Sequence, residues 1–432
     1  MTIRRLTWRA CAFVCATASA AAVAGCTGDA PADLGPAPGR IEVEVSTSGG
    51  HVDPYGYTVT LNGSESEEVG PEGVVAFTNL AEGSHEIELS EPAANCESDD
   101  PNPRTVAVEA GATTEIAYEI LCVRVERVLF ESERTGNLDL WIMEPNGTNQ
   151  ENLTDEAGAD EHADWSPDGM RIAFESVRSG DREIWVMDAD GSNAINLSAA
   201  ADDDYSPRWS PSGAHIAFVS ERTGDAEIWV MEDDGSNAQP LTDTPGADYD
   251  PQWSPDVSQI AFVTMRGGDP EIWIMDASGS NPANLSNHPD DDDDPRWSPD
   301  GAQILFQSER GGKEEIWVME PDGSNPTQLT DDAGADNEDP AWSPDGTRIA
   351  FMSTRSGDYD IWVMEPDGSD PTNLTESLDD DVDAQWSSDG SQLVFVSIRT
   401  GDYEVWAMEA DGSNPLRLTD MAGDDFAPAW RR

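Results

Sequence analysis

Basic residues are scarce in this chain. Its 432 residues contain 87 aspartates and glutamates against 23 lysines and arginines, a formal net charge of −64, and Lys313 is the only lysine. Nucleic-acid binding needs basic side chains that neutralise phosphates, so this balance argues against a nucleic-acid partner. It favours cations, basic polypeptides or a salty environment, although a solvated acidic surface that keeps the protein soluble also explains it.

Long apolar segments are also missing, apart from residues 10–25 near the N-terminus. Arginines precede this run, and it is too short to span a bilayer. The run ends in Val23-Ala24-Gly25-Cys26, which resembles a lipobox, where signal peptidase II cuts before a cysteine that carries lipid. We therefore expect residues 1–25 to be a signal peptide and Cys26 to be lipidated. The alternative is an ordinary secretory signal with a chance cysteine.

Cysteines are few, five in all. Cys11 and Cys15 fall within the expected signal peptide and Cys26 is reserved for lipid, so Cys96 and Cys122 remain as an even pair. An exported protein enters an oxidising compartment, and these two cysteines are therefore predicted to form a disulfide.

Residues 26–39 are rich in proline, glycine and alanine and predict a flexible tether. Residues 40–122 then show short alternating stretches separated by turn residues, which predicts a small β-sandwich. Its segment GVVAFTNLAEGSHEIELS (73–90) resembles carboxypeptidase-regulatory-like or PEGA-like domains of bacterial surface proteins. That resemblance implies a spacer or adhesive module.

Tryptophan recurs at a fixed period from residue 124 to the end. Fourteen of the 15 tryptophans form two series whose steps are 44 residues, with a single step of 45 in each. The two series are Trp141, Trp185, Trp229, Trp273, Trp317, Trp362 and Trp406, and Trp165, Trp209, Trp253, Trp297, Trp342, Trp386 and Trp430. A period of about 40–45 residues with four strands per unit is typical of a propeller blade.

The units predict an all-β fold, a seven-bladed β-propeller of four-stranded blades over residues 124–432, behind the sandwich. In EIWVM (183–187) both faces are apolar, as a strand clamped between two blades requires. The array begins with a second strand, RVLFES (127–132), and ends with a first strand, FAPAW (426–430). We therefore expect the C-terminal strand to complete the N-terminal blade, which removes open sheet edges.

Two copies of the repeat, SERTGDAEIWVMEDDGSNAQPLT (220–242) and STRSGDYDIWVMEPDGSDPTNLT (353–375), resemble the WD40-like (PD40) repeats of the TolB family. The resemblance implies a propeller that serves as a binding scaffold, as the non-catalytic part of a peptidase, or as a lyase. The chain departs from TolB itself, which resembles a six-bladed ring with a different N-terminal domain.

A polar residue stands five positions before each tryptophan of the second series: Asp160, Asp204, Asp248, Asp292, Asn337, Asp381 and Asp425. An arginine recurs in the turn expected on the same rim: Arg134, Arg178, Arg222, Arg266, Arg310, Arg355 and Arg399. One interpretation is a set of salt bridges that hold neighbouring blades. The other is an acidic rim that binds a basic peptide or Ca²⁺, because crowded carboxylates repel one another unless a cation neutralises them.

Catalytic motifs are lacking: there is no Gly-x-Ser-x-Gly elbow and no histidine-rich cluster among the five histidines. His162 and His288 fall in loops of the expected rim and could bind a metal, and the alternative is that these two isolated histidines are plain surface residues. The sequence therefore predicts an exported, monomeric scaffold, anchored to the cell envelope, on the outer membrane, by its lipid alone. It would bind an envelope protein or basic peptide through the acidic rim and channel. The alternative is a propeller-type lyase or hydrolase acting on polysaccharide.

Overall fold

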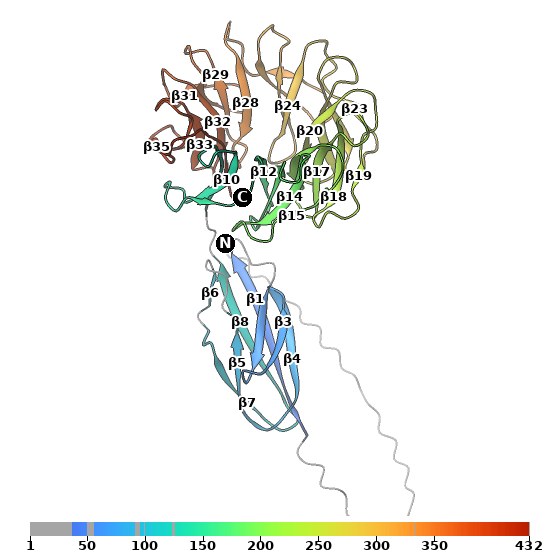
Figure 1. The fold of residues 1–432 in the computed structure, drawn as a ribbon, viewed down its shortest axis with the longest axis vertical. Coiled ribbons are helices and arrows are strands. Elements are labelled where there is room, and N and C mark those ends of the chain that lie inside the picture. The colour runs from blue at the N-terminus through green and yellow to red at the C-terminus, as the bar shows by residue number, and fades with distance from the viewer. Residues whose placement is uncertain are drawn as a thin grey trace, which may run out of the picture.

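The computed structural model describes residues 37–49, 56–90, 96–98, 100–122, 126–332 and 334–431. All regular structure in these residues is β-strand (Figure 1), so none of them forms a helix that could cross a membrane. The expected signal peptide and the lipidated Cys26 lie outside the described residues and stay predictions.

The N-terminal region contains two four-stranded sheets, in the orders β4-β1-β8-β6 and β3-β2-β5-β7. The strands are β1 (Gly39–Gly49), β2 (Tyr57–Leu61), β3 (Glu65–Val69), β4 (Glu72–Leu80), β5 (Gly83–Leu89), β6 (Cys96–Glu97), β7 (Arg104–Val108) and β8 (Thr113–Cys122). Strands β1 and β8 pair in parallel, and the other pairings are antiparallel.

One hydrophobic core lies between these two sheets. The alternating residues Ile41, Val43 and Val45 of β1 pack with Val59 of β2 and Ile87 of β5. The period-2 pattern of the sequence thus buries one face of each sheet. The short strands β3 and β6 were not predicted, because β3 carries four exposed residues and β6 has only two residues.

Cys96 is disulfide-bonded. Its backbone partner across the β6–β8 pair is Cys122, whose side chain lies outside the described residues. The bond between these two cysteines therefore stays our prediction.

Residues 128–430 form seven four-stranded antiparallel sheets in chain order. The first strands are β12 (Asp160–Trp165), β16 (Asp204–Trp209), β20 (Asp248–Trp253), β24 (Asp292–Trp297), β28 (Asn337–Trp342), β32 (Asp381–Trp386) and β36 (Asp425–Trp430). The second strands are β9 (Val128–Ser132), β13 (Arg171–Ser176), β17 (His215–Ser220), β21 (Gln259–Thr264), β25 (Ile304–Ser308), β29 (Ile349–Ser353) and β33 (Gln392–Ser397).

The third strand of each sheet is long, and the fourth strand, at the outer edge, has only two residues. The third strands are β10 (Asp139–Met143), β14 (Glu183–Asp188), β18 (Glu227–Glu232), β22 (Glu271–Asp276), β26 (Glu315–Met319), β30 (Asp360–Met364) and β34 (Glu404–Glu409). The fourth strands are β11 (Glu151–Asn152), β15 (Ile195–Asn196), β19 (Gln239–Pro240), β23 (Ala283–Asn284), β27 (Thr327–Gln328), β31 (Thr372–Asn373) and β35 (Leu416–Arg417).

The two ends of this array share one sheet, as the sequence predicted. β36 pairs antiparallel with β9, and the sheet has the order β11-β10-β9-β36. This sheet contacts the sheets before and after it through β33 and β12, so the seven sheets close a ring. Ring closure leaves no unpaired first or second strand at the ends of the array.

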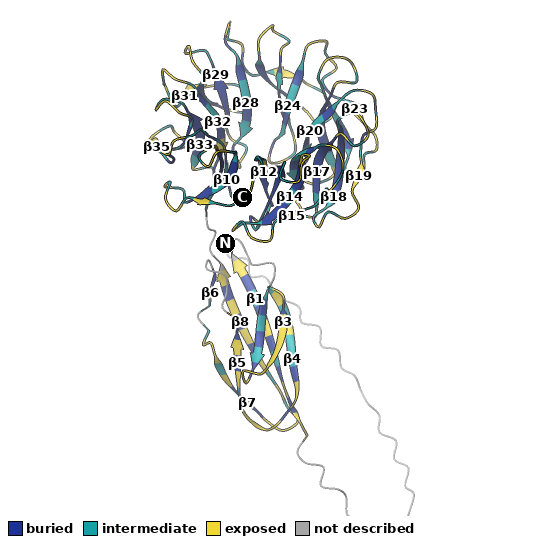
Figure 2. Ribbon diagram, viewed as in Figure 1, coloured by how far each residue is buried: buried dark blue, intermediate teal, exposed yellow. Residues whose placement is uncertain are grey.

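Each sheet is apolar on both faces, and each face packs against a different neighbour. On β14, Ile184 and Val186 join a core cluster with the next sheet, whereas Met187 joins a cluster with the preceding one. Figure 2 shows that the long strands are mostly buried while the loops between them are exposed. One sheet alone could not bury both faces, so the repetition of nearly identical units is required by packing.

Candidate functional site in the central channel

The seven predicted rim residues lie inside the sheets. Asp160, Asp204, Asp248, Asp292, Asn337, Asp381 and Asp425 are all 0% exposed. The six aspartates each accept a hydrogen bond from an arginine of the predicted arginine set, at 2.5 to 3.0 Å. Asn337 accepts one from Arg355 at 2.8 Å. These residues are therefore not an exposed acidic surface.

Each of these pairs joins two strands of one sheet. The salt-bridge interpretation, in which the pairs hold neighbouring blades, is therefore wrong. Asp160 begins β12 and is opposite Ser176, the last residue of β13, and Arg178 follows β13. Ser176 Oγ accepts from Arg178 Nε at 2.8 Å, and the Arg178 guanidinium lies 4.9 Å from the centroid of Trp185. The repeated arginine is thus a structural clamp that contacts an indole in every repeat and, in six of the seven, the aspartate that begins the first strand. Its Nε also donates to the hydroxyl that ends the second strand, except in Arg310, whose Nε donates to Asp292.

A bulge two residues further along each first strand sets which side chains face the channel. The register with the second strand shifts here in all seven sheets. The bulged residues have φ between 43° and 55°: His162, Ser206, Asp250, Asp294, Asp339, Asp383 and Ala427. Aspartate tolerates this left-handed conformation, but asparagine would do so without a charge, so the backbone alone does not explain four carboxylates.

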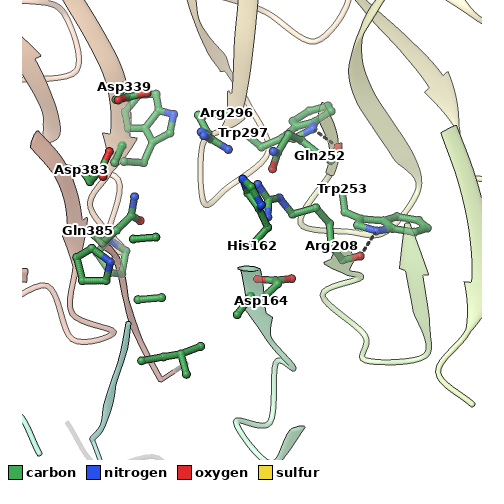
Figure 3. Close-up of a pocket in the computed structure, with 18 of the residues that line it drawn as sticks. His162, Asp164, Arg208, Gln252, Trp253, Arg296, Trp297, Asp339, Asp383 and Gln385 are labelled. Carbon is green, nitrogen blue, oxygen red and sulfur yellow. Dashed lines mark hydrogen bonds between the residues drawn. The ribbon is translucent and has the colours of Figure 1, made fainter. Parts of the chain in front are cut away.

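The first strands line a central cavity of about 920 Å³. Figure 3 shows His162, Arg208 and Arg296 on one side of it and Asp339, Asp383 and Gln385 on the other. Carboxylates in the lining are Glu131, Asp164, Asp339 and Asp383, against the two guanidinium groups of Arg208 and Arg296. The channel wall is therefore acidic, with an excess of two carboxylates in the lining.

Three neighbouring carboxylates of the bulge ring are poorly neutralised. Burial raises the pKa of Asp294 to about 7, although Arg296 Nη2 lies 2.6 Å from its Oδ1. Burial and the nearby Asp383 raise the pKa of Asp339 to about 6. Burial also raises the pKa of Asp383. Within the described residues, Asp294 Oδ2 has no hydrogen-bond partner. A bound cation would stabilise the ionised form of all three.

His162 is the bulge residue of β12. Its Nδ1 lies 3.0 Å from Glu175 Oε1 of β13, and this interaction is the main cause that raises the pKa of the imidazole. The second predicted candidate, His288, lies 3.4 Å from Asp290 Oδ2 in the loop before β24. In the part of the chain that is described, His288 belongs to no group of three metal-ligating side chains, whereas His162 does.

Sequence reasoning found the correct strand but selected the wrong position within it. In a regular strand, residues five, three and one before the tryptophan would share a face. The bulge breaks this alternation, so the residue five before is buried against arginine and those three and one before reach the channel. A signal was present: the position three before varies among histidine, serine, aspartate and alanine, whereas the position five before hardly varies.

A closed ring of four-stranded sheets around a lined channel is the architecture of a β-propeller. The family model described as "TolB beta propeller domain" (PD40) matches residues 124–244, 182–338 and 332–431. The chain belongs to this family. No curated protein matches the chain.

Several solved structures are similar to this chain. TolB from Acinetobacter baumannii is 23% identical, with 71% of this chain and 83% of that chain covered and a TM-score of 0.47. Oligogalacturonate lyase from Vibrio parahaemolyticus is 14% identical, with 68% and 86% covered and a TM-score of 0.52. A puromycin-hydrolyzing peptidase from Mycobacterium tuberculosis is 15% identical, with 67% and 50% covered and a TM-score of 0.53. For the lyase and the peptidase, at these identities, the likeness is one of fold alone.

Proposed function

We propose that this protein is a non-catalytic scaffold of the cell envelope whose propeller channel binds a basic segment of a partner protein. The seven sheets act as the blades of one propeller, and the N-terminal sheets act as a sandwich-like spacer. Lipid on Cys26 holds the exported monomer at the membrane. Membership of the TolB propeller family supports a protein-binding role.

The observation that carries this proposal is the acidic patch of Asp339 and Asp383 in the cavity lining, with the buried Asp294 next to Asp339. Burial raises the pKa of all three carboxylates, and repulsion from Asp383 raises that of Asp339 further. Arg296 lowers the pKa of Asp294 and Asp339 without cancelling the effect of burial. Keeping them ionised costs free energy in the free protein. A lysine or arginine side chain that enters the cavity recovers that cost and gains charge-assisted hydrogen bonds.

The test is isothermal titration calorimetry of the purified protein with a hexa-arginine peptide. We expect saturable binding that weakens with salt, because the contacts are electrostatic. Asp339→Asn/Asp383→Asn should weaken binding about 10- to 100-fold, since one hydrogen bond to a charged group contributes about 1.5–3 kcal/mol and 1.4 kcal/mol is tenfold.

A matched control removes the same charge elsewhere. Glu365 and Asp420 are exposed and lie outside the cavity lining, so Glu365→Gln/Asp420→Asn should bind the peptide like the parent. Equal weakening in both double variants would mean that net charge, not the channel, attracts the peptide. Cleavage of an acidic oligosaccharide by the parent would contradict the non-catalytic role.

A further inference from the structure

One position departs from the repeat at two neighbouring sheets. The residue before the serine or threonine that ends the second strand is Val219, Val263, Gln307, Met352 or Val396 in five sheets, but Glu131 and Glu175 in the other two. Glu131 is 8% exposed and Glu175 is 3% exposed. Burying a carboxylate where the same fold accepts valine costs free energy, so packing does not explain these two glutamates.

Both glutamates contact the one histidine of the bulge ring, Glu131 through the backbone N–H of His162 and Glu175 through its imidazole. His162 Nδ1 lies 3.0 Å from Glu175 Oε1 and 3.9 Å from Glu161 Oε2. One ligand atom from each of Glu161, His162 and Glu175 lies within 4.8 Å of the others. A tetrahedral ion about 2.0–2.2 Å from each ligand atom holds those atoms about 3.3–3.6 Å apart, and the separations of 3.0 and 3.9 Å lie on either side of that value.

The surrounding hydrogen bonds orient this cluster. The backbone N–H of Ser206 donates to Glu175 Oε2 at 3.1 Å, and the backbone N–H of His162 donates to Glu131 Oε1 at 2.7 Å. The bulge at His162, with φ of 50°, turns the imidazole into the cavity lining. Outer hydrogen bonds of this kind are what fixes the ligands of a metal site. Arg182 Nε lies 3.8 Å from Glu175 Oε1 and would have to remain outside the ion's ligand shell.

We propose that Glu161, His162 and Glu175 bind one divalent transition-metal ion at the channel wall. One imidazole and two carboxylates suit Zn²⁺, Mn²⁺ or Co²⁺, whereas Ca²⁺ takes six to eight oxygen ligands. Three protein ligands leave a position that water or a ligand in the cavity can occupy. The three ligands of this site are different residues from Asp339 and Asp383 of the peptide-binding wall, so the two proposals stand independently.

The experiment titrates metal-free protein with Zn²⁺ by calorimetry and with Co²⁺ by visible absorption. We expect one Zn²⁺ per chain, and Co²⁺ absorption bands of a nitrogen- and oxygen-ligated ion that Zn²⁺ abolishes. His162→Ala and Glu175→Val should each weaken Zn²⁺ binding by more than about 100-fold, because losing even an outer-shell partner costs about 10–100-fold.

The repeat supplies variants that should fold. Alanine already occupies the bulge position at Ala427 with φ of 43°, and valine occupies the Glu175 position at Val219. The metal-free variants should therefore unfold no more easily than the parent. His288→Ala is the control that removes a histidine outside the cluster, and it should leave Zn²⁺ binding unchanged.

Three outcomes overturn the proposal: no saturable Zn²⁺ binding to the parent, equal binding by parent and His162→Ala, or loss of binding in His288→Ala but not in His162→Ala. In each case the contact between His162 and Glu175 would be a hydrogen bond that only orders the bulge. Peptide binding by the parent is unaffected by these outcomes, so a failure of the metal site is distinguishable from a failure of the scaffold role.

Discussion

The buried pair Arg134–Asp425 joins the strands at the two ends of the propeller array, β9 and β36. Asp425 begins β36 and Arg134 follows β9, so the pair joins residues 291 positions apart, with side-chain exposures of 6% for Arg134 and 0% for Asp425. Removing the carboxylate with Asp425→Ala leaves a buried guanidinium without its counter-charge. Breaking a buried pair in this way costs about 3–5 kcal/mol.

The structure favours the lower end of this range. Arg134 keeps its hydrogen bond to Ser132 Oγ at 2.7 Å and its position 4.7 Å from the centroid of Trp141. We therefore expect Asp425→Ala to lower the free energy of unfolding by about 3 kcal/mol in urea denaturation. Asp425→Asn should cost less, because Asn337 already accepts a hydrogen bond from Arg355 in another sheet.

The matched control is Asp381→Ala, which breaks the equivalent pair with Arg399 between β32 and β33. These strands are adjacent in sequence, so the chain itself keeps them close together. Hydrogen exchange should therefore show fast local opening of β36 in Asp425→Ala and no comparable opening of β32 in Asp381→Ala. Equal exchange in the two variants would refute the view that the closing strand is held by this pair.

Two further predictions concern pH and turn geometry. The pKa of Asp339 is raised in the folded state to about 6 from an ordinary value of 3.8. The folded protein therefore favours the protonated carboxyl, whose contribution to the free energy of unfolding is complete below about pH 3.8 and is lost as the pH rises through about 6. The stability of Asp339→Asn relative to the parent should therefore increase between pH 4 and 7 in urea denaturation, and a constant difference would contradict this. Gly147 has φ of +80°, and an added Cβ would lie 2.6 Å from the Leu418 carbonyl oxygen, whereas Gly136 has φ of +105° with open space around it. Gly147→Ala should therefore lower the melting temperature more than Gly136→Ala, because overpacking adds about 1–3 kcal/mol to the backbone strain that both share.

The acidic composition has more than one structural origin. The third strands begin with buried carboxylates, such as Glu183 and Glu404, that accept hydrogen bonds from Ser198 and Thr419 at 2.6 Å. Together with the carboxylates that pair with arginine, these acids stabilise each sheet internally. Part of the net charge therefore belongs to the repeat itself, and only the remainder is free to attract a partner.

The sequence by itself determined the all-β class, the positions of the long propeller strands and the closure of the ring. Two tryptophan series with a constant step and strands apolar on both faces leave few other ways to bury the chain. The N-terminal repeat lacks a first strand, and the array ends with a first strand that has no further strands after it. These two ends are therefore expected to pair, because the N-terminal sheet would otherwise keep an unpaired edge.

Only the tertiary structure decided which polar residues face the channel. The bulge at His162 and its equivalents breaks the period-2 alternation, so Asp160 is buried against Arg178 while Asp339 and Asp383 line the cavity. The contact between His162 and Glu175 was equally hidden, because it depends on the strand register that the bulge creates. A bulge adds residues to one strand without a periodic signal, and the burial of a carboxylate depends on neighbours that are distant in the sequence.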